Sequence, residues 1–91
     1  MGIELCGYKL TEIAKNKYKV EGNECPDDMI VTIRREKGGY RAECNYAIRR
    51  GNAANAYQAM HLRPTAEETL KHLLISLIPG KDAKWEKVKI R

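Results

Sequence analysis

Arginine is concentrated in one stretch of the sequence. Six of the seven arginines fall between residues 34 and 63, whereas nine of the ten lysines fall outside that window. The window holds seven basic and two acidic residues, and the rest of the chain is balanced. Lysine suffices for a solvated surface, but the planar guanidinium of arginine adds bidentate bonding to phosphate or carboxylate and stacking on aromatic rings. This segregation predicts a binding surface for an anionic partner.

A solvated sheet face is the alternative interpretation of the same arginines. Open faces of sheets commonly carry charges, and charges along a sheet edge deter strand-to-strand aggregation. Glu43 lies among the arginines in the sequence, as expected for such a face.

Catalytic, metal and cofactor chemistry is not indicated. Ser76, the only serine, falls in the apolar centre of a predicted helix, and His61 is a lone histidine. Cys6, Cys25 and Cys44 are widely separated, with no CxxC pair for a metal. Acidic neighbours of Cys25 disfavour a reactive thiolate. We expect a protein that is not an enzyme, with no catalytic residue, no metal and no cofactor.

Length and composition predict one domain spanning residues 1–91. The chain is 43% hydrophobic and 32% charged, within the range of folded proteins, and it is too short for two cores. Its longest apolar run, residues 73–78, is far below the roughly 20 residues that span a bilayer. Three cysteines and no signal peptide indicate free thiols in a reducing compartment. We expect a cytoplasmic protein that does not enter the membrane.

Two alternating segments flank Lys37-Gly38-Gly39 and predict an antiparallel hairpin. The first comprises residues 29–34 and the second residues 40–49, and the two glycines supply the backbone freedom of a tight turn. The side chains expected to face inward are Met29, Val31, Ile33, Tyr40, Ala42, Cys44, Tyr46 and Ile48.

The N-terminal region predicts a further strand. "CGYKL" at residues 6–10 has the same spacing as "CNYAI" at residues 44–48, which places Cys6, Tyr8 and Leu10 inward. Residues 10–15 fit a strand or a helix, because Leu10, Ile13 and Ala14 also follow helical spacing.

A helix is predicted over about residues 65–78. Thr65 can accept a hydrogen bond from the amide of Glu68, and Pro79-Gly80 ends the run. One buried stripe is expected to contain Ala66, Leu70, Leu73, Leu74, Leu77 and Ile78.

The remaining segments complete the predicted fold. "GNAANA" is a turn-rich link, residues 57–63 form a short strand, and Trp85, Val88 and Ile90 alternate in a closing strand. We expect an α+β domain in which an antiparallel sheet of four or five strands carries one helix on one face.

This architecture places the arginines of the hairpin on the open face of the sheet. Alternation points Arg34, Arg41 and Arg49 away from the helix, and residues of the next strand should join them. The predicted partner-binding residues are Arg34, Arg41, Arg49, Arg50, Tyr57, His61 and Arg63.

The order of elements between residues 29 and 78 resembles the N-terminal domain of HicB-type antitoxins. The shared features are the hairpin, the Gly-Gly-Tyr turn and a helix that begins at Thr-x-x-Glu, and they cover about half of the chain. "RRGNAANAYQ" departs from the Pro/Gly-containing segment expected there, and a basic face is unusual for a protein that neutralises a basic toxin. The resemblance implies a class of small, non-catalytic proteins that act by occupying another macromolecule.

The leading functional hypothesis is a protein-binding module, of inhibitor, antitoxin or adaptor type, that docks on an acidic macromolecular partner. The alternative is an RNA or single-stranded DNA binder that uses the same face on phosphates and bases. Few exposed aromatics are predicted, the RNP and GxxG elements are absent, and the net charge is only +5, which favours the protein partner. Clustered arginines also suit a small phosphorylated ligand. The sequence indicates no oligomeric state.

Overall fold

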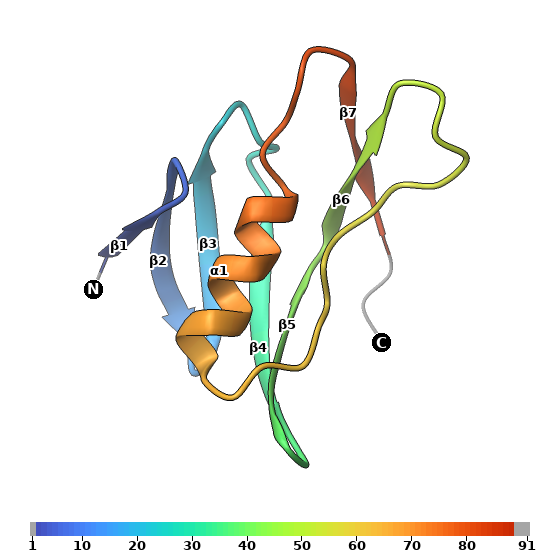
Figure 1. Ribbon diagram of the computed structural model, residues 1–91. Helices are drawn as coiled ribbons and strands as arrows, with labels where there is room; N and C mark the ends of the chain where they lie inside the picture. Colours follow the sequence, from blue (N-terminus) through green and yellow to red (C-terminus); the bar gives the residue numbers. More distant parts are fainter. Residues whose placement is uncertain (1, 89–91) are drawn as a thin grey trace.

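The computed structural model describes residues 2–88 of the chain, which form two antiparallel sheets and one helix (Figure 1). Five strands follow one another as a meander in the order β1-β2-β3-β4-β5, and β6 and β7 form a separate two-stranded sheet. The elements are β1 (Gly2–Leu5), β2 (Tyr8–Ala14), β3 (Lys17–Gly22), β4 (Ile30–Glu36), β5 (Gly39–Cys44), β6 (Tyr46–Arg50), α1 (Ala66–Ser76) and β7 (Ala83–Lys87). The predicted α+β class, with a five-stranded sheet and one helix on one face, is confirmed.

The central hairpin forms as predicted. In β4 and β5, Ile33 pairs with Ala42, and Glu36 pairs with Gly39 across the turn. Met29 and Val31 are fully buried, as their alternation indicates.

The first strands settle the ambiguity at residues 10–15. Tyr8 and Leu10 point inward as predicted, and the strand continues to Ala14, with an irregularity at Ile13. Cys6 instead lies in the turn that joins β1 to β2. Both turn residues, Cys6 and Gly7, have positive φ angles of 55° and 81°, as in the type I′ turns that match the twist of a hairpin.

One predicted strand is divided in the structure. Residues 40–49 are not one strand, because the chain bends at Asn45 and β6 leaves the main sheet. The Asn45 side chain accepts from the amide of Ile30 at 2.8 Å and donates to the carbonyl of Asp28 at 2.8 Å, so it fixes the bend. Ala47, expected outward, is therefore buried. Strands β1 and β3 were not predicted.

The closing strand pairs with β6 rather than with the main sheet. Trp85 of β7 lies opposite Ile48 of β6, and both side chains pack in the core. Val88 follows the strand, and its amide donates to the carbonyl of Asn45 at 2.9 Å. Ile90, the last residue of the predicted strand, lies outside the described residues.

The helix begins where its capping signal predicts. Thr65 is the N-cap, and its hydroxyl accepts from the amide of Glu68 at 3.1 Å. Leu70, Leu73, Leu74 and Leu77 are buried against the sheet. Ile78 was expected in this stripe but is 42% exposed, because the helix ends before it. No helix within residues 2–88 is long and apolar enough to cross a bilayer.

The C-terminus of α1 has no basic residue in its last turn, and β6 supplies one. The Nη2 of Arg50 donates to the carbonyls of Ser76 and Ile78 at 3.1 and 2.9 Å. A cation at this end also suits the helix dipole. The hydroxyl of Tyr8 donates to the carbonyl of Leu77, so the end of the helix is fastened to β2 as well.

Thiol labelling should report the facing of β5. Cys44 is 1% exposed and burial raises its pKa to about 12, whereas Cys6 and Cys25 are half-buried. Because the thiolate is the reactive form, a maleimide should label Cys6 and Cys25 well before Cys44 under native conditions. Peptide mapping over time gives the order, and the three thiols of the denatured chain are the control. Early labelling of Cys44 would show that this face of β5 is open to solvent.

Candidate functional site

Residues 57–63 run along β5 and β6 without forming the strand that was predicted for them. They make main-chain bridges only at their two ends. Tyr57 exchanges two hydrogen bonds with Ile48, at 2.8 and 3.1 Å, and Arg63 exchanges two with Tyr40, at 2.9 and 2.7 Å. We call residues 57–63 the anchored segment.

Side chains bridge the gap between these two ends. The side-chain amide of Gln58 accepts a hydrogen bond from the main-chain N–H of Cys44 at 2.7 Å and donates one to the main-chain carbonyl of Cys44 at 2.9 Å. It therefore takes the place of the main chain of a neighbouring strand. The hydroxyl of Thr69 accepts from the amide of Ala42 at 3.2 Å and donates to the carbonyl of His61 at 3.1 Å. The free edge of β5 is thus satisfied by side chains, which holds the anchored segment in place.

The anchored segment presents apolar side chains to solvent. Tyr57 is 56% exposed, Met60 is 43% exposed and Leu62 is 38% exposed. Beside Tyr57 and Met60 is a cavity of about 380 Å³, whose wall also includes Glu43, Ala47 and Val88. Since large apolar side chains gathered on a surface mark interaction sites, this part of the molecule is the candidate functional site.

Three of the predicted arginines each form an ion pair with a glutamate. Arg34 lies 3.5 Å from Glu43, and Arg41 lies 3.0 Å from Glu36. The Nη2 of Arg49 donates to Glu86 at 3.0 Å, and its Nε lies close to the other carboxylate oxygen without a hydrogen bond, so the two form an ion pair. Two of these glutamates belong to the same stretch of sequence, and only Glu86, a residue of β7, is added by the fold, so most of the local positive charge remains.

Arg41 connects this charged surface to the anchored segment. Its side chain donates to the carbonyl of Met60 in addition to its pair with Glu36. Arg34 and Arg41 lie directly opposite each other in β4 and β5, on the face that points away from α1. Two like charges in this position repel each other, and the two glutamates offset that repulsion.

The other predicted residues lie in different surroundings. Arg50 caps α1, as described above. The Nη2 of Arg63 lies 3.4 Å from the Nδ1 of His72, beside the helix rather than on the open face. His61 remains close to Tyr57, with 3.4 Å between its Nε2 and the tyrosine hydroxyl. The structure therefore brings Tyr57 and His61 together, links Arg41 to the same segment at the carbonyl of Met60, and places Arg50 and Arg63 beside the helix.

Sequence reasoning missed several residues of this site. Met60 and Leu62 alternate with Ala59 and His61 in the sequence, which predicted that they belong to a strand; their exposure depends on how the segment is anchored. Gln58 carries no local signal for its role, because its partner, Cys44, is 14 residues away. Glu86 is farther still from Arg49 in the sequence, at 37 residues.

A second polar cluster joins the loop before β4 to the two-stranded sheet. The hydroxyl of Tyr46 donates to Asp28 at 2.6 Å, and the ammonium of Lys87 lies 3.2 Å from the other carboxylate oxygen. The hydrogen bond from Tyr46, followed by that from Lys87, lowers the pKa of Asp28, and the carboxylate in turn raises the pKa of Tyr46. These contacts hold the strands in place.

Acid should weaken this cluster. The pKa of Asp28 is lower in the folded protein than its ordinary value of 3.8. Its contribution to the stability of the fold is therefore present above pH 3.8 and is lost as the pH falls through the lowered pKa of the folded protein. Asp28→Asn should lower the melting temperature near neutral pH, and the difference from wild type should shrink in acid. Asp27→Asn is the matched control. A difference that stays constant down to the acid limit would contradict this assignment.

No protein-family model matches the chain, and no curated protein or solved structure matches it significantly. The comparisons therefore add nothing to the resemblance to HicB-type antitoxins. Within residues 2–88, no three His, Cys, Asp or Glu side chains are grouped so that they could hold a metal ion.

Proposed function

We propose that this protein is a small, non-catalytic binding module of the cytoplasm, of inhibitor, antitoxin or adaptor type, that docks on an acidic macromolecular partner. The observation that carries the proposal is the anchored segment, which holds Tyr57, Met60 and Leu62 in exposed positions and accepts a hydrogen bond from Arg41 at the carbonyl of Met60. Tyrosine, methionine and arginine are the residue types enriched in the centres of protein interfaces.

The anchoring supports binding because it lowers the entropic cost of association. Gln58, Thr69 and Arg41 fix the main chain of the segment through hydrogen bonds. A surface that is already ordered loses little conformational freedom when a partner docks. The exposed apolar side chains can then be buried with a net gain of free energy.

The arginines would contribute specificity by releasing their intramolecular glutamates and pairing with carboxylates of the bound protein. Pairs between exposed side chains contribute little to stability, typically less than about 1 kcal/mol. A carboxylate on the partner can therefore replace Glu36 on Arg41 or Glu86 on Arg49 at small cost. This argument favours a partner with acidic side chains around an apolar centre.

Nucleic acid is the second candidate, because the exposed ring of Tyr57 can stack on a base. Glu36, Glu43 and Glu86 repel phosphate and the carboxylates of an acidic protein alike, so they do not distinguish the two candidates. Capture from a native lysate, with and without nuclease, separates the two candidates: a partner retained after nuclease treatment is a protein.

Substitution of the arginines tests the surface directly. Arg34, Arg41 and Arg49 changed together to alanine should weaken binding of the captured partner at least tenfold. Each partly exposed ion pair contributes less than about 1 kcal/mol to stability, and the loss of Arg41 also removes its hydrogen bond to the carbonyl of Met60, worth about 1 kcal/mol more. The matched control changes Lys15, Lys71 and Lys81 to alanine, which removes the same charge elsewhere. Changing the three arginines to lysine keeps the positive charge but removes the planar guanidinium group. If the guanidinium groups bind carboxylates of the partner through two parallel hydrogen bonds, the lysine variant should restore little of the binding. Unchanged binding by the triple alanine variant would contradict the proposal.

A nucleic-acid partner would give a different signature with the same variants. The logarithm of the affinity would fall linearly with the logarithm of the salt concentration, and the slope would flatten by about one unit per lost phosphate contact. Tyr57→Ala together with Met60→Ala should abolish binding of a protein partner. The same double variant would leave the salt slope unchanged.

A further inference from the structure

The edges of the two sheets are protected unequally. The edge of β5 is covered by the anchored segment and the side chains of Gln58 and Thr69. The outer strand of the small sheet, β7, carries exposed lysines at positions 84 and 87, which deter pairing with another strand. In contrast, β1 has the sequence Gly-Ile-Glu-Leu, with no lysine or proline, and within residues 2–88 it pairs only with β2.

The hairpin geometry defines which main-chain groups of β1 are available. Leu5 and Tyr8 flank the two-residue turn, so they form a hydrogen-bonded pair, and the pairs along an antiparallel ladder alternate. The main-chain groups of Leu5 and Ile3 therefore point toward β2. Those of Glu4 and Gly2 point outward, where they can pair with another strand.

We propose that β1 pairs antiparallel with β1 of a second copy of this chain, which joins the two five-stranded sheets into one. In the register that we infer, Gly2 of each copy lies opposite Glu4 of the other, and Ile3 lies opposite Ile3. The outward main-chain groups of all four Gly2 and Glu4 residues are then satisfied. A register shifted by one pair would instead set Glu4 against Glu4, and this like-charge contact opposes it.

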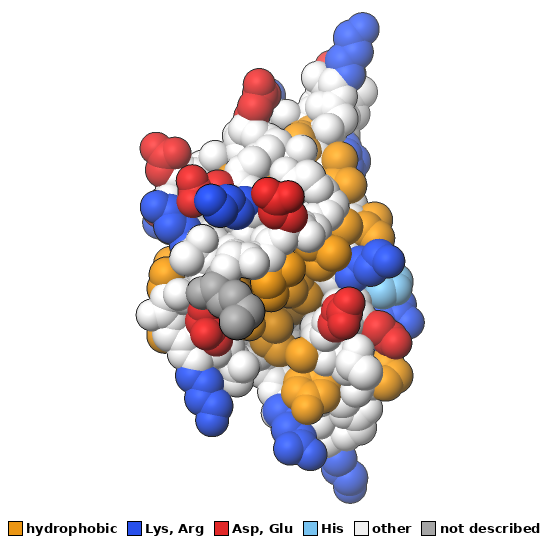
Figure 2. Space-filling view, turned by 90° about the vertical axis from the view of Figure 1, so that its left-hand side faces the viewer, with side chains coloured by type: hydrophobic (Ala, Val, Ile, Leu, Met, Phe, Trp, Pro, Cys, Tyr) orange, Lys and Arg blue, Asp and Glu red, His pale blue; other side chains and the backbone are white. Residues whose placement is uncertain are grey.

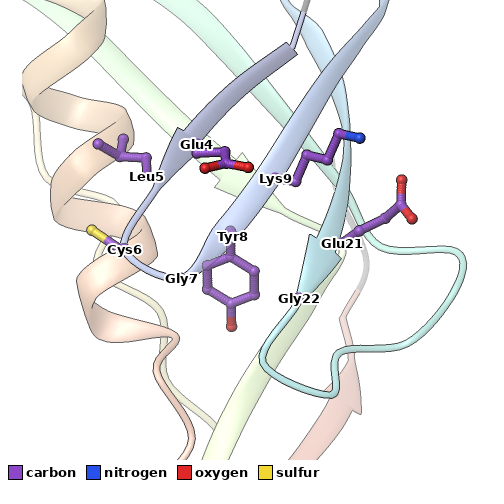
Figure 3. Close-up of a pocket in the computed structure, with 8 residues that line it drawn as sticks. All are labelled: Glu4, Leu5, Cys6, Gly7, Tyr8, Lys9, Glu21 and Gly22. Carbon is purple, nitrogen blue, oxygen red and sulfur yellow. The ribbon is translucent and has the colours of Figure 1, made fainter.

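Charge complementarity supports this register. Lys9 lies beside Gly2, since its Cε is 3.9 Å from the position that a Cβ on Gly2 would occupy. Its ammonium points away from Glu4 of its own chain (Figure 3), and neither residue forms an ion pair with any part of residues 2–88. Glu4 of the second copy, placed opposite Gly2, would come within reach of Lys9. The two-fold symmetry forms this pair twice.

The other face of the same edge is apolar. Ile3 is 41% exposed and pairs with buried Leu10, so it lies on the side of the sheet that carries α1. Viewed from the β1 side, the molecule shows a continuous band of hydrophobic side chains (Figure 2). The self-pairing of β1 brings Ile3 of one copy against Ile3 of the other and so buries apolar surface at this edge. An apolar contact on one face and two ion pairs on the other favour the second copy as the occupant of this edge.

Sedimentation velocity tests the association. The wild-type protein should sediment with twice the mass of one chain, and Ile3→Lys should sediment as a single chain because it sets two ammonium groups against each other at the two-fold axis. The matched control is Ile13→Lys, which changes an exposed isoleucine of β2 and should leave the dimer intact. A wild-type protein that remains a single chain at the highest soluble concentration would overturn the proposal.

Charge exchange tests the register without depending on the fold of Ile3→Lys. Glu4→Lys should shift the equilibrium toward single chains, and the double variant Glu4→Lys with Lys9→Glu should restore the dimer. A double variant that associates no better than Glu4→Lys would contradict the pairing.

Crosslinking locates the two-fold axis. Facing residues of a pair without hydrogen bonds have Cα atoms about 4.5 Å apart, and disulfides span roughly 4.4–6.8 Å. Ile3→Cys treated with copper phenanthroline should give a dimer whose crosslinked peptide joins position 3 to position 3. Ile13→Cys should not crosslink through position 13. A dimer linked only through the native cysteines would exclude this register. Arg34 and Arg41 lie on β4 and β5, at the side of the five-stranded sheet opposite β1, and Arg49 lies in the two-stranded sheet. The alanine variants of these three arginines should therefore still dimerise.

Discussion

Leu74→Ala is expected to lower the free energy of unfolding by about 2 to 5 kcal/mol. Leu74 is fully buried, and it is held between the leucines of α1 and the inward side chains of the sheet. Shortening it removes apolar contact and leaves a cavity that the sheet cannot collapse to fill, since the strands on either side are hydrogen-bonded in register. Chemical denaturation at a fixed protein concentration measures the loss.

The control for this variant lies on the solvent side of the same helix. Lys71→Ala changes an exposed position, and it should alter the stability by no more than about 0.5 kcal/mol, because alanine favours helices. If Leu74→Ala unfolded at the same denaturant concentration as wild type, the buried face of α1 would be misassigned.

The helix could be predicted because all of its signals are local. Thr65 and Glu68 are three residues apart, and the leucines of the buried stripe recur within one run of the sequence. The β4–β5 hairpin was predictable for the same reason, since its alternation is regular and its turn contains two glycines. In both elements the residues that determine the structure are near neighbours in the chain.

The missed strand shows the opposite case. In β3 only Tyr18 and Val20 face inward, and lysines occupy the alternate positions. Such a short pattern carries little signal, and it forms a strand because β2 and β4 pair with it on both sides. The bend at Asn45 also depends on distant partners, namely the main chain of Asp28 and Ile30.

The arginine surface was predicted in part, and for a physical reason. Alternation placed Arg34 and Arg41 correctly on the open face, because a strand has a fixed period of two. Glu36 and Glu43 belong to the same hairpin and could be counted from the sequence, whereas the pair between Arg49 and Glu86 could not be predicted, because Glu86 is 37 residues away. Arg50 illustrates the same limit: its partners are helix carbonyls that are 26 and 28 residues away.

The second large effect is expected at the tip of the β4–β5 hairpin, where Gly39 meets the anchored segment. Gly39 has a φ of 152°, a conformation that other residues rarely adopt, and a Cβ at this position would overlap the carbonyl oxygen of Arg63. That oxygen accepts the hydrogen bond from the amide of Tyr40 at 2.7 Å, and Arg63 donates one back at 2.9 Å. Gly39→Ala therefore adds strain and breaks the bridge that holds one end of the segment.

We expect Gly39→Ala to cost about 3 kcal/mol, the sum of backbone strain of about 1 to 3 kcal/mol and two hydrogen bonds worth about 1 kcal/mol each, less relaxation of the loop. Gly38→Ala is the matched control. Gly38 also has a positive φ, of 93°, but the nearest atom to its Cβ is a methyl of Leu62 at 3.5 Å, which is ordinary contact. The control should cost only about 1 kcal/mol.

Hydrogen exchange of the amides of Tyr40 and Arg63 distinguishes local release from general destabilisation. In Gly39→Ala these two amides should exchange faster than the amides of β2 and β3, because the loss begins at the bridge. If the anchored segment is the docking surface, Gly39→Ala should also weaken binding of the captured partner more than Gly38→Ala. A Cβ at either glycine would lie 3.5 Å from Leu62, so the two variants differ mainly in the bridge to Arg63. Equal stability, exchange and binding in the two alanine variants would mean that the bridge to Arg63 does not hold the segment. The preorganisation on which the proposed function rests would then have to come from the bridge between Tyr57 and Ile48 and from the side chains of Gln58, Thr69 and Arg41.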